Sequence, residues 1–393
     1  MKPKRSLPVL IFSTLSMMTA FAAWSVFAPI ATEIQKIYQL STAEKSILVA
    51  IPVLLGSLMR IPMGILTDRY GGRKIYSLTM LLLIFPLIGA GFTHSYSMLL
   101  FWAFFIGMAG TTFAISITYI SKWYPPEKQG FILGIAGMGN IGSAIASFLV
   151  PMIFVTHGLS WVFWSLAISV GIMSFILWIG TQDQKLSSKP KSFKESLSVL
   201  KFKETWLLSI FYSLTFGSFV TFSIYLPTLL QEQFKLTTLD AGIKTAGFVT
   251  VATLIRPVGG YLSDRFGARR ILAFVYSGVL LLGLVIAFSI ENFHLFSISC
   301  FLIAISLGIG NGAVFKMVPE VSTGNIGAVT GIVGAFGGLG GFFPPIILGF
   351  FKELTDSYLL GFALLSLFSL ICLFLNYTGF NKPKIQLDSK KIA

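Results

Sequence analysis

The chain has 393 residues, of which 55% are apolar and only 11% are Asp, Glu, Lys or Arg. A soluble domain usually carries about 25% charged residues, and so few charges cannot cover the surface of a soluble protein of this length. The net charge of +14 would suggest nucleic-acid binding in a soluble protein. Here, however, the basic residues stand in short gaps between apolar runs, which is typical of membrane topology and argues against a nucleic-acid partner.

The apolar runs, taken in chain order, predict the membrane helices. The first run, 8–31, follows a basic N-terminus and contains Ala20-Phe21-Ala22, so a cleaved signal peptide is an alternative. Its length exceeds the 7–15 residues of a signal-peptide core, and we expect a retained helix. Five runs follow at 44–66, 75–93, 97–121, 130–154 and 159–180. After the polar, lysine-rich stretch 181–203 come six more, at 204–230, 241–263, 271–290, 294–318, 325–351 and 357–378.

At about 20 residues per span, the twelve runs predict an all-α membrane protein with twelve transmembrane helices. The break in the middle predicts two six-helix bundles, 1–180 and 204–393, joined by a solvated linker at 181–203. With an even number of spans, both termini lie on one side, and that side holds 22 of the 29 basic residues. The positive-inside rule then predicts a plasma-membrane protein with both termini and the linker in the cytoplasm.

The chain also repeats itself at half its length. Residues 58–74 align without gaps on residues 254–270, and residues 130–137 align on residues 327–334. Both repeats begin from the same side of the membrane, which predicts parallel repeats related by a pseudo-two-fold axis along the membrane normal.

The first repeat carries a glycine- and charge-rich loop motif in each half. It comprises Gly64, Asp68, Arg69, Gly71 and Arg73, with Asp264, Arg265, Gly267 and Arg269 in the copy. Glycine permits a tight turn, and an acid beside arginines can form a charge network between helix ends. A basic loop that only sets the topology is the alternative. The pair resembles the loop signature of the major facilitator superfamily, which implies that fold over essentially the whole chain.

Seven of the eight arginines lie in the two copies of this repeat. Arg60 and Arg256 each lie eight residues before the motif aspartate, about 12 Å inside the helix end and near the middle of the bilayer. All fifteen acids fall in connectors, termini or outermost helical turns, so no intramembrane carboxylate can pair with these arginines. Two symmetry-related guanidiniums predict an anion site, because their planar forks suit a planar oxyanion.

Glycines are dense at 134–142 and again at 331–345, which indicates close helix approach or flexing, with packing alone as the alternative. Together with Arg60 and Arg256, these stretches resemble the paired signatures of the nitrate/nitrite porter family. The resemblance implies that the substrate pocket includes Arg60, Arg256, Tyr212, Asn140, Phe113, Phe216, Gly137, Gly139, Gly337 and Gly338.

The resemblance further implies a monomeric transporter of nitrate, nitrite or both, and not an enzyme. No cofactor or metal is expected, because both cysteines lie in apolar runs and the three histidines in connectors. Without an acid or histidine inside the spans, exchange of nitrate for nitrite is favoured over proton-coupled symport. The alternative functions are a transporter of larger organic anions, a drug exporter and a non-transporting anion sensor.

Overall fold

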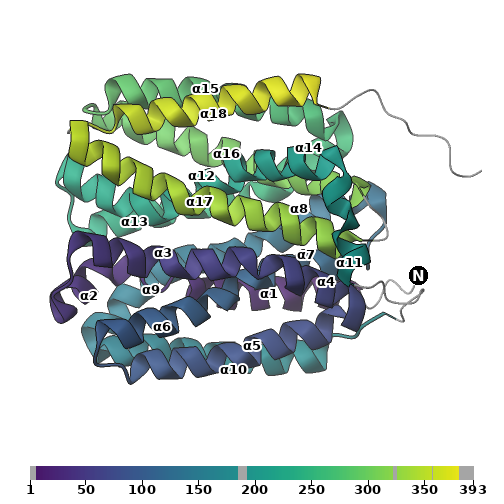
Figure 1. The fold of residues 1–393 in the computed structure, drawn as a ribbon, viewed down its shortest axis with the longest axis horizontal. Coiled ribbons are helices and arrows are strands. Elements are labelled where there is room, and N and C mark those ends of the chain that lie inside the picture. The colour runs from purple at the N-terminus through teal and green to yellow at the C-terminus, as the bar shows by residue number, and fades with distance from the viewer. Residues whose placement is uncertain (1–5, 185–192, 322–324, 356, 380–393) are drawn as a thin grey trace, which may run out of the picture.

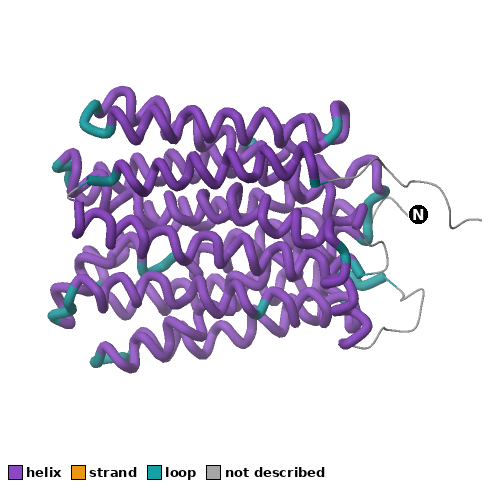
Figure 2. The backbone as a smooth tube through the Cα atoms, turned by 45° about the horizontal axis from the view of Figure 1, so that its top comes forward, coloured by secondary structure: helices purple, strands orange, loops and turns teal. Residues whose placement is uncertain are grey.

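The structure, a computed structural model, describes residues 6–184, 193–321, 325–355 and 357–379. All regular secondary structure in these ranges is helical (Figure 2). The first set of helices comprises α1 (Ser6–Trp24), α2 (Ala31–Tyr38), α3 (Thr42–Leu58), α4 (Arg60–Tyr70), α5 (Gly72–Gly91), α6 (Tyr96–Ile106), α7 (Thr112–Ser121), α8 (Gln129–Gly137), α9 (Ile141–His157) and α10 (Leu159–Gly180). The second set comprises α12 (Lys203–Phe234), α13 (Thr238–Leu254), α14 (Arg256–Phe266), α15 (Ala268–Ser289), α16 (Phe293–Val321), α17 (Ile326–Thr355) and α18 (Leu359–Thr378).

The helices lie side by side with their long axes roughly aligned, and the two sets form the two halves of the molecule (Figure 1). The described chain begins and ends on the side where α11 (Phe193–Ser196) lies, which we call the linker face (Figure 1). Within the predicted linker 181–203, α11 and the 3-10 turn Leu197–Lys201 are helical, and residues 185–192 lie outside the described ranges.

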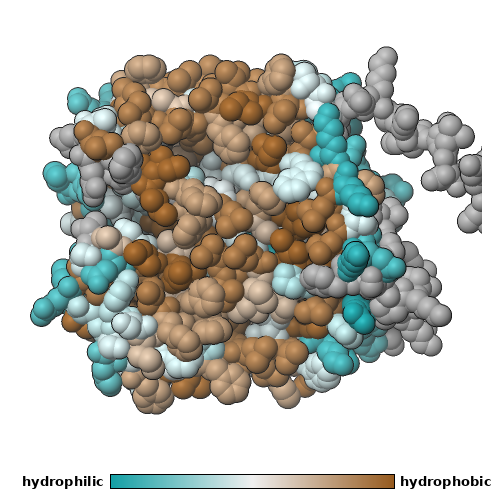
Figure 3. Space-filling model, in the orientation of Figure 1, coloured by the Kyte–Doolittle hydropathy of each residue, from teal (hydrophilic) through white to brown (hydrophobic). Residues whose placement is uncertain are grey.

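On the face shown in Figure 3, a broad apolar band covers the middle of the molecule, with hydrophilic residues at the two ends. Large apolar side chains on this surface are strongly exposed, for example Phe288 at 79% and Phe274 at 74%, as expected where lipid tails replace water. Eleven helical segments of the described residues are long and apolar enough to cross a membrane. The predicted run 241–263 is not among them; it corresponds to α13 and α14, of 17 and 11 residues, which Ile255 separates.

Two spans are interrupted immediately before an arginine. Met59 separates α3 from α4, and Ile255 separates α13 from α14. Proline follows each break, at Pro62 and Pro257, and a proline nitrogen cannot donate to the carbonyl four residues earlier. Helical hydrogen bonding resumes directly after each break. The Met63 amide donates to the Met59 carbonyl and the Gly259 amide to the Ile255 carbonyl, each at 3.1 Å. The breaks therefore occur at equivalent places in the two repeats.

Glycines let the two halves meet near the linker face. Gly64 of α4 and Gly327 of α17 approach so closely that a Cβ on either would collide with the backbone of the other. Gly130 of α8 and Gly260 of α14 form the equivalent contact. These crossings require glycine because any side chain would push the halves apart.

Candidate functional site

Arg60 and Arg256 lie in the interior between the two halves, at 0% and 2% exposure. Arg60 donates from Nε to the Gly110 carbonyl (3.0 Å) and from Nη1 to the Gly334 carbonyl (2.6 Å). Arg256 donates from Nη1 to the Gly137 carbonyl (3.1 Å). Gly137 and Gly334 are equivalent positions of the second repeat, so each arginine bonds the matching glycine carbonyl of the other half.

Neither arginine forms an ion pair within the described part of the chain. Their hydrogen-bond partners there are all neutral. Besides the backbone carbonyls, Nη2 of Arg256 donates to the Tyr212 hydroxyl at 3.2 Å. Nη2 of Arg60 is buried and has no hydrogen-bond partner among the described residues. Two guanidiniums balanced only by neutral oxygens make a site that would be stabilised by a bound anion.

Aromatic rings stack beside these two arginines. The rings of Tyr212 and Phe216 are nearly parallel, with centroids 4.9 Å apart, and Phe113 faces Phe216 at 5.8 Å. The Arg60 guanidinium carbon lies 5.2 Å from the Phe113 centroid and 5.1 Å from that of Phe216. The predicted residues Arg60, Arg256, Tyr212, Phe113 and Phe216 thus lie together. A fourth ring, Phe315, packs edge-on against Tyr212 at 4.7 Å, and the sequence motifs gave no signal for it.

The four predicted glycines of the two stretches differ in whether they contact residues of the site. A Cβ on Gly137 would lie 2.9 Å from Nε of Arg256, while one on Gly337 would collide with Tyr212 and one on Gly338 with Ser57. Gly139 differs, because a Cβ there would meet Met17 of α1 at 2.6 Å. Gly139 therefore packs against α1, whereas Gly137 and Gly338 border the arginines and Gly337 borders Tyr212.

Asn140 is completely buried in the 3-10 turn Met138–Asn140 that interrupts the span between α8 and α9. Neither its amide nitrogen nor its amide oxygen has a partner among the described residues. A buried amide without partners is unfavourable, and it indicates a group that is satisfied by a ligand or by water.

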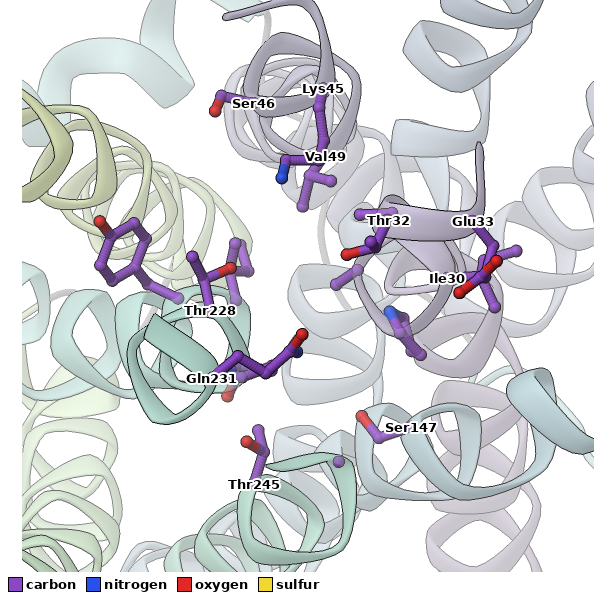
Figure 4. A pocket seen from close by; sticks show the side chains of 18 of the residues that line it. Ile30, Thr32, Glu33, Lys45, Ser46, Val49, Ser147, Thr228, Gln231 and Thr245 are labelled. Carbon is purple, nitrogen blue, oxygen red and sulfur yellow. The ribbon is translucent and has the colours of Figure 1, made fainter. Parts of the chain in front are cut away.

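A cavity of about 1130 Å³ opens on the face opposite the linker face. Figure 4 shows its polar lining, where Lys45 of α3 and Gln231 of α12 extend into the space from opposite sides. Lys45 has no ion-pair partner in the described ranges, whereas Glu33, also at the cavity, pairs with Lys36 at 3.2 Å. Glu232, the other acid at the wall, accepts a hydrogen bond from Tyr358 at 2.6 Å.

Mostly apolar side chains lie at the deep end of this cavity, between it and the arginines. A pocket of only about 20 Å³ continues from the cavity floor, lined by four serines and by apolar side chains. Five of the latter form what we call the apolar layer: Trp24, Phe27, Val53, Phe219 and Val220. All five are at most 6% exposed. The arginine site is therefore enclosed on this side by side chains and on the other by the helix crossings at the linker face.

Charged contacts reinforce the closure of the linker face. Asp68 pairs with Lys122 at 2.9 Å and accepts the Gly327 amide of α17 at 2.7 Å. In the copy, Asp264 pairs with Lys316 at 3.2 Å and accepts the Phe131 amide of α8 at 3.0 Å. Each aspartate thus caps a helix N-terminus of the other half, where a negative charge is favoured by the helix dipole.

Among the described residues, the motif arginines form no ion pair with Asp68 or Asp264, which differs from the predicted network of acid and adjacent arginines. Arg69 and Arg265 lie over the rings of Tyr70 and Phe266, at 5.3 and 5.2 Å. The side chain of Arg73 donates to the Thr181 carbonyl (3.2 Å), and that of Arg269 to the Asn376 carbonyl (2.8 Å). The acids pair instead with Lys122, which directly follows α7, and with Lys316 of α16, and a count of loop charges does not single out these two lysines.

Gly71 and Gly267 explain the turns of the motif. Their φ angles are +94° and +87°, in a region that side chains rarely adopt, so both positions require glycine.

These features define a membrane protein of two related helical halves that enclose a cationic centre. The family model of the Major Facilitator Superfamily matches residues 13–345 and 208–390. The chain belongs to this superfamily of transporters, and its predicted twelve-helix fold class is confirmed.

Named relatives are similar over nearly the whole chain. The "Nitrite extrusion protein" of Bacillus subtilis (strain 168) is 39% identical over 361 residues, covering 91% of this chain and 90% of that protein. The "Probable nitrate transporter NarT" of Staphylococcus aureus (strain MRSA252) is 37% identical, covering 93% of this chain and 94% of that protein. The predicted resemblance to the nitrate/nitrite porter family is thereby confirmed.

Solved structures share the fold at low identity. The human organic anion transporter MFSD10 (TETRAN) aligns with a TM-score of 0.80 at 13% identity, covering 94% of this chain and 99% of that chain. A bacterial homologue of the lysosomal transporter Spinster, in an inward-facing conformation, aligns with a TM-score of 0.67 at 19% identity, covering 96% and 97%.

Proposed function

We propose that this protein transports nitrate and nitrite across the plasma membrane by alternating access. The observation that carries the proposal is the pair of buried arginines, one from each repeat, without any carboxylate partner in the described ranges. Relatives named as a nitrite extrusion protein and a nitrate transporter support the choice of anion.

In this proposal Arg60 and Arg256 supply the charge that binds the anion, and Tyr212 and Asn140 supply further hydrogen-bond donors. Phe113 and Phe216 hold the planar anion between their rings. A flat group inserted between two rings needs a spacing of about 7 Å, twice the optimal carbon contact distance. Since the two centroids are 5.8 Å apart here, the rings must separate when the anion enters.

Alternating access follows from the two enclosing regions. The linker face is closed by Asp68, Asp264 and the glycine crossings, while a cavity leads inward from the opposite face. Transport requires the linker-face contacts to break while the opposite face closes, by a rocking of the halves about the site. We assign the linker face to the cytoplasm because it carries most of the basic residues, and we expect a monomer.

Exchange is the favoured mode. Two like charges in the interior resist closure around an empty site, and a bound anion removes much of that repulsion, so the loaded carrier crosses faster than the empty one. The acids that line the cavity, Glu33 and Glu232, already have polar partners at its wall and lie away from the arginines.

The test is a counterflow assay with purified protein in liposomes. Nitrite inside the vesicles should accelerate entry of labelled nitrate with no pH gradient applied, and chloride inside should not. Uptake that ignores internal nitrite but needs an imposed proton gradient would establish proton-coupled symport instead. Counterflow of larger carboxylates with no response to nitrate would refute the assignment of the anion.

A further inference from the structure

Asn311 lies in α16, outside both glycine stretches and both arginine repeats. Its side chain is 1% exposed, and neither Nδ2 nor Oδ1 has a hydrogen-bond partner among the described residues. An amide in the interior that makes no hydrogen bonds is strongly unfavourable, so it calls for a ligand or a water molecule.

The same anomaly marks one other asparagine. Asn140 and Asn311 are the two described asparagines whose amide nitrogen and oxygen are both buried and without a partner. By contrast, the buried amide of Asn376 donates to the Arg269 carbonyl at 2.8 Å. Asn140 is assigned as a ligand in the proposed function, and Asn311 shares its burial and its lack of amide partners among the described residues.

The neighbours of Asn311 along α16 fix its position beside the arginine site. A Cβ on Gly310 would lie 2.6 Å from the Thr215 methyl group of α12, and one on Gly312 would collide with the Arg256 carbonyl. One turn further along the same helix face, the Phe315 ring packs edge-on against Tyr212 at 4.7 Å and against Phe113 at 5.0 Å. Asn311 therefore lies between α12 and the Arg256 segment, one turn from the aromatic rings.

We propose that Asn311 is a ligand of the transported anion and donates from Nδ2 to one of its oxygens. Each half then contributes one arginine and one asparagine: Arg60 and Asn140 from the first, Arg256 and Asn311 from the second. An anion with several oxygens can accept from all four side chains, whereas a monatomic anion of similar charge has a single centre. This inference rests on the proposed function and adds a residue to that site.

The test uses thermal unfolding of the purified full chain, with nitrate titrated from micromolar to molar concentration, and the same counterflow assay. Asn311→Leu is close to isosteric and removes both unpartnered amide atoms. Without nitrate, this variant should unfold at the same temperature as the unaltered protein or higher, because an unsatisfied polar group has been replaced by an apolar one. Its nitrate affinity should fall about 10- to 100-fold, as expected for the loss of a hydrogen bond to a charged ligand.

Ser366→Ala is the matched control. Ser366 of α18 is 1% exposed, and its hydroxyl is also buried without a partner, but it lies against α15 and away from the arginines. Removing this hydroxyl should leave nitrate affinity unchanged. If Asn311→Leu does not yield monodisperse protein, Asn311→Asp provides the second test, since a carboxylate beside Arg256 should compete with the anion and lower affinity at least as much.

The outcomes separate this inference from the proposed function. If the unaltered protein is stabilised by nitrate and the Asn311 variants bind it equally well, the role of Asn311 is overturned and the transport proposal stands. If neither nitrate nor nitrite stabilises the unaltered protein, the proposed function fails, and the inference fails with it.

Discussion

Replacing either buried arginine by lysine keeps the positive charge and removes the fork of donors. Arg60 uses Nε and Nη1 for two carbonyls on different helices, and Nη2 remains for a ligand. A lysine has one nitrogen at the end of a flexible chain and cannot serve these directions together. Loss of one hydrogen bond to a charged group is worth about 1.5–3 kcal/mol, which corresponds to an affinity loss of about 10- to 150-fold.

The same loss is expected for Arg256→Lys, because Arg256 also bonds across to the other half and to Tyr212. Nitrate affinity would be measured by thermal shift and exchange by counterflow, after a check for monodisperse protein. Arg270→Lys, at an exposed position of the linker face, is the matched control and should bind nitrate normally. Near-normal affinity in either buried-site variant would refute the reasoning, because positive charge alone would then suffice.

Three further changes test other parts of the molecule. Gly338→Leu places a branched side chain against Ser57 and should cost about 1–3 kcal/mol of stability or block one conformation; unchanged exchange would contradict this. Asp68→Asn and Asp264→Asn should each loosen the linker face, seen as longer spin-label distances across it; unaltered distances would show that the ion pairs are dispensable. Lys45→Gln should slow uptake several-fold at low salt and little at high salt, whereas the control Lys74→Gln, at an exposed position of the linker face, should not.

Much of the fold could be predicted because a bilayer imposes a simple rule: each span must be apolar and about 20 residues long. The breaks inside spans are harder to predict. Pro62 and Pro257 signal a disturbed helix, but proline is tolerated in membrane helices when neighbours satisfy the freed carbonyls. The 3-10 turn Met138–Asn140 contains no proline; its Gly139 packs against α1, and the preceding Gly137 packs against the Arg256 side chain.

The site residues could be predicted from the sequence where an intramembrane charge occurs at equivalent positions of both repeats. Arg60 and Arg256 stand out because a buried charge is expensive and both halves repeat it. Lys122 looks like an ordinary basic loop residue and Lys316 stands near the end of a predicted span, and only the folded arrangement brings them to Asp68 and Asp264. Asn311 belongs to no repeat, so nothing in the sequence distinguishes it from a helix-packing amide.

The apolar layer above the site has a consequence for selectivity. An anion that passes between Trp24, Phe27, Val53, Phe219 and Val220 must leave most of its hydration shell behind, since the pocket at the cavity floor has room for about one water. The energy needed to strip water from an ion rises with the square of its charge, so a divalent anion such as sulfate faces about four times the barrier of a monovalent anion of equal size. The apolar layer therefore favours anions that dehydrate readily, and the arginines then favour anions whose shape fits their hydrogen-bond donors.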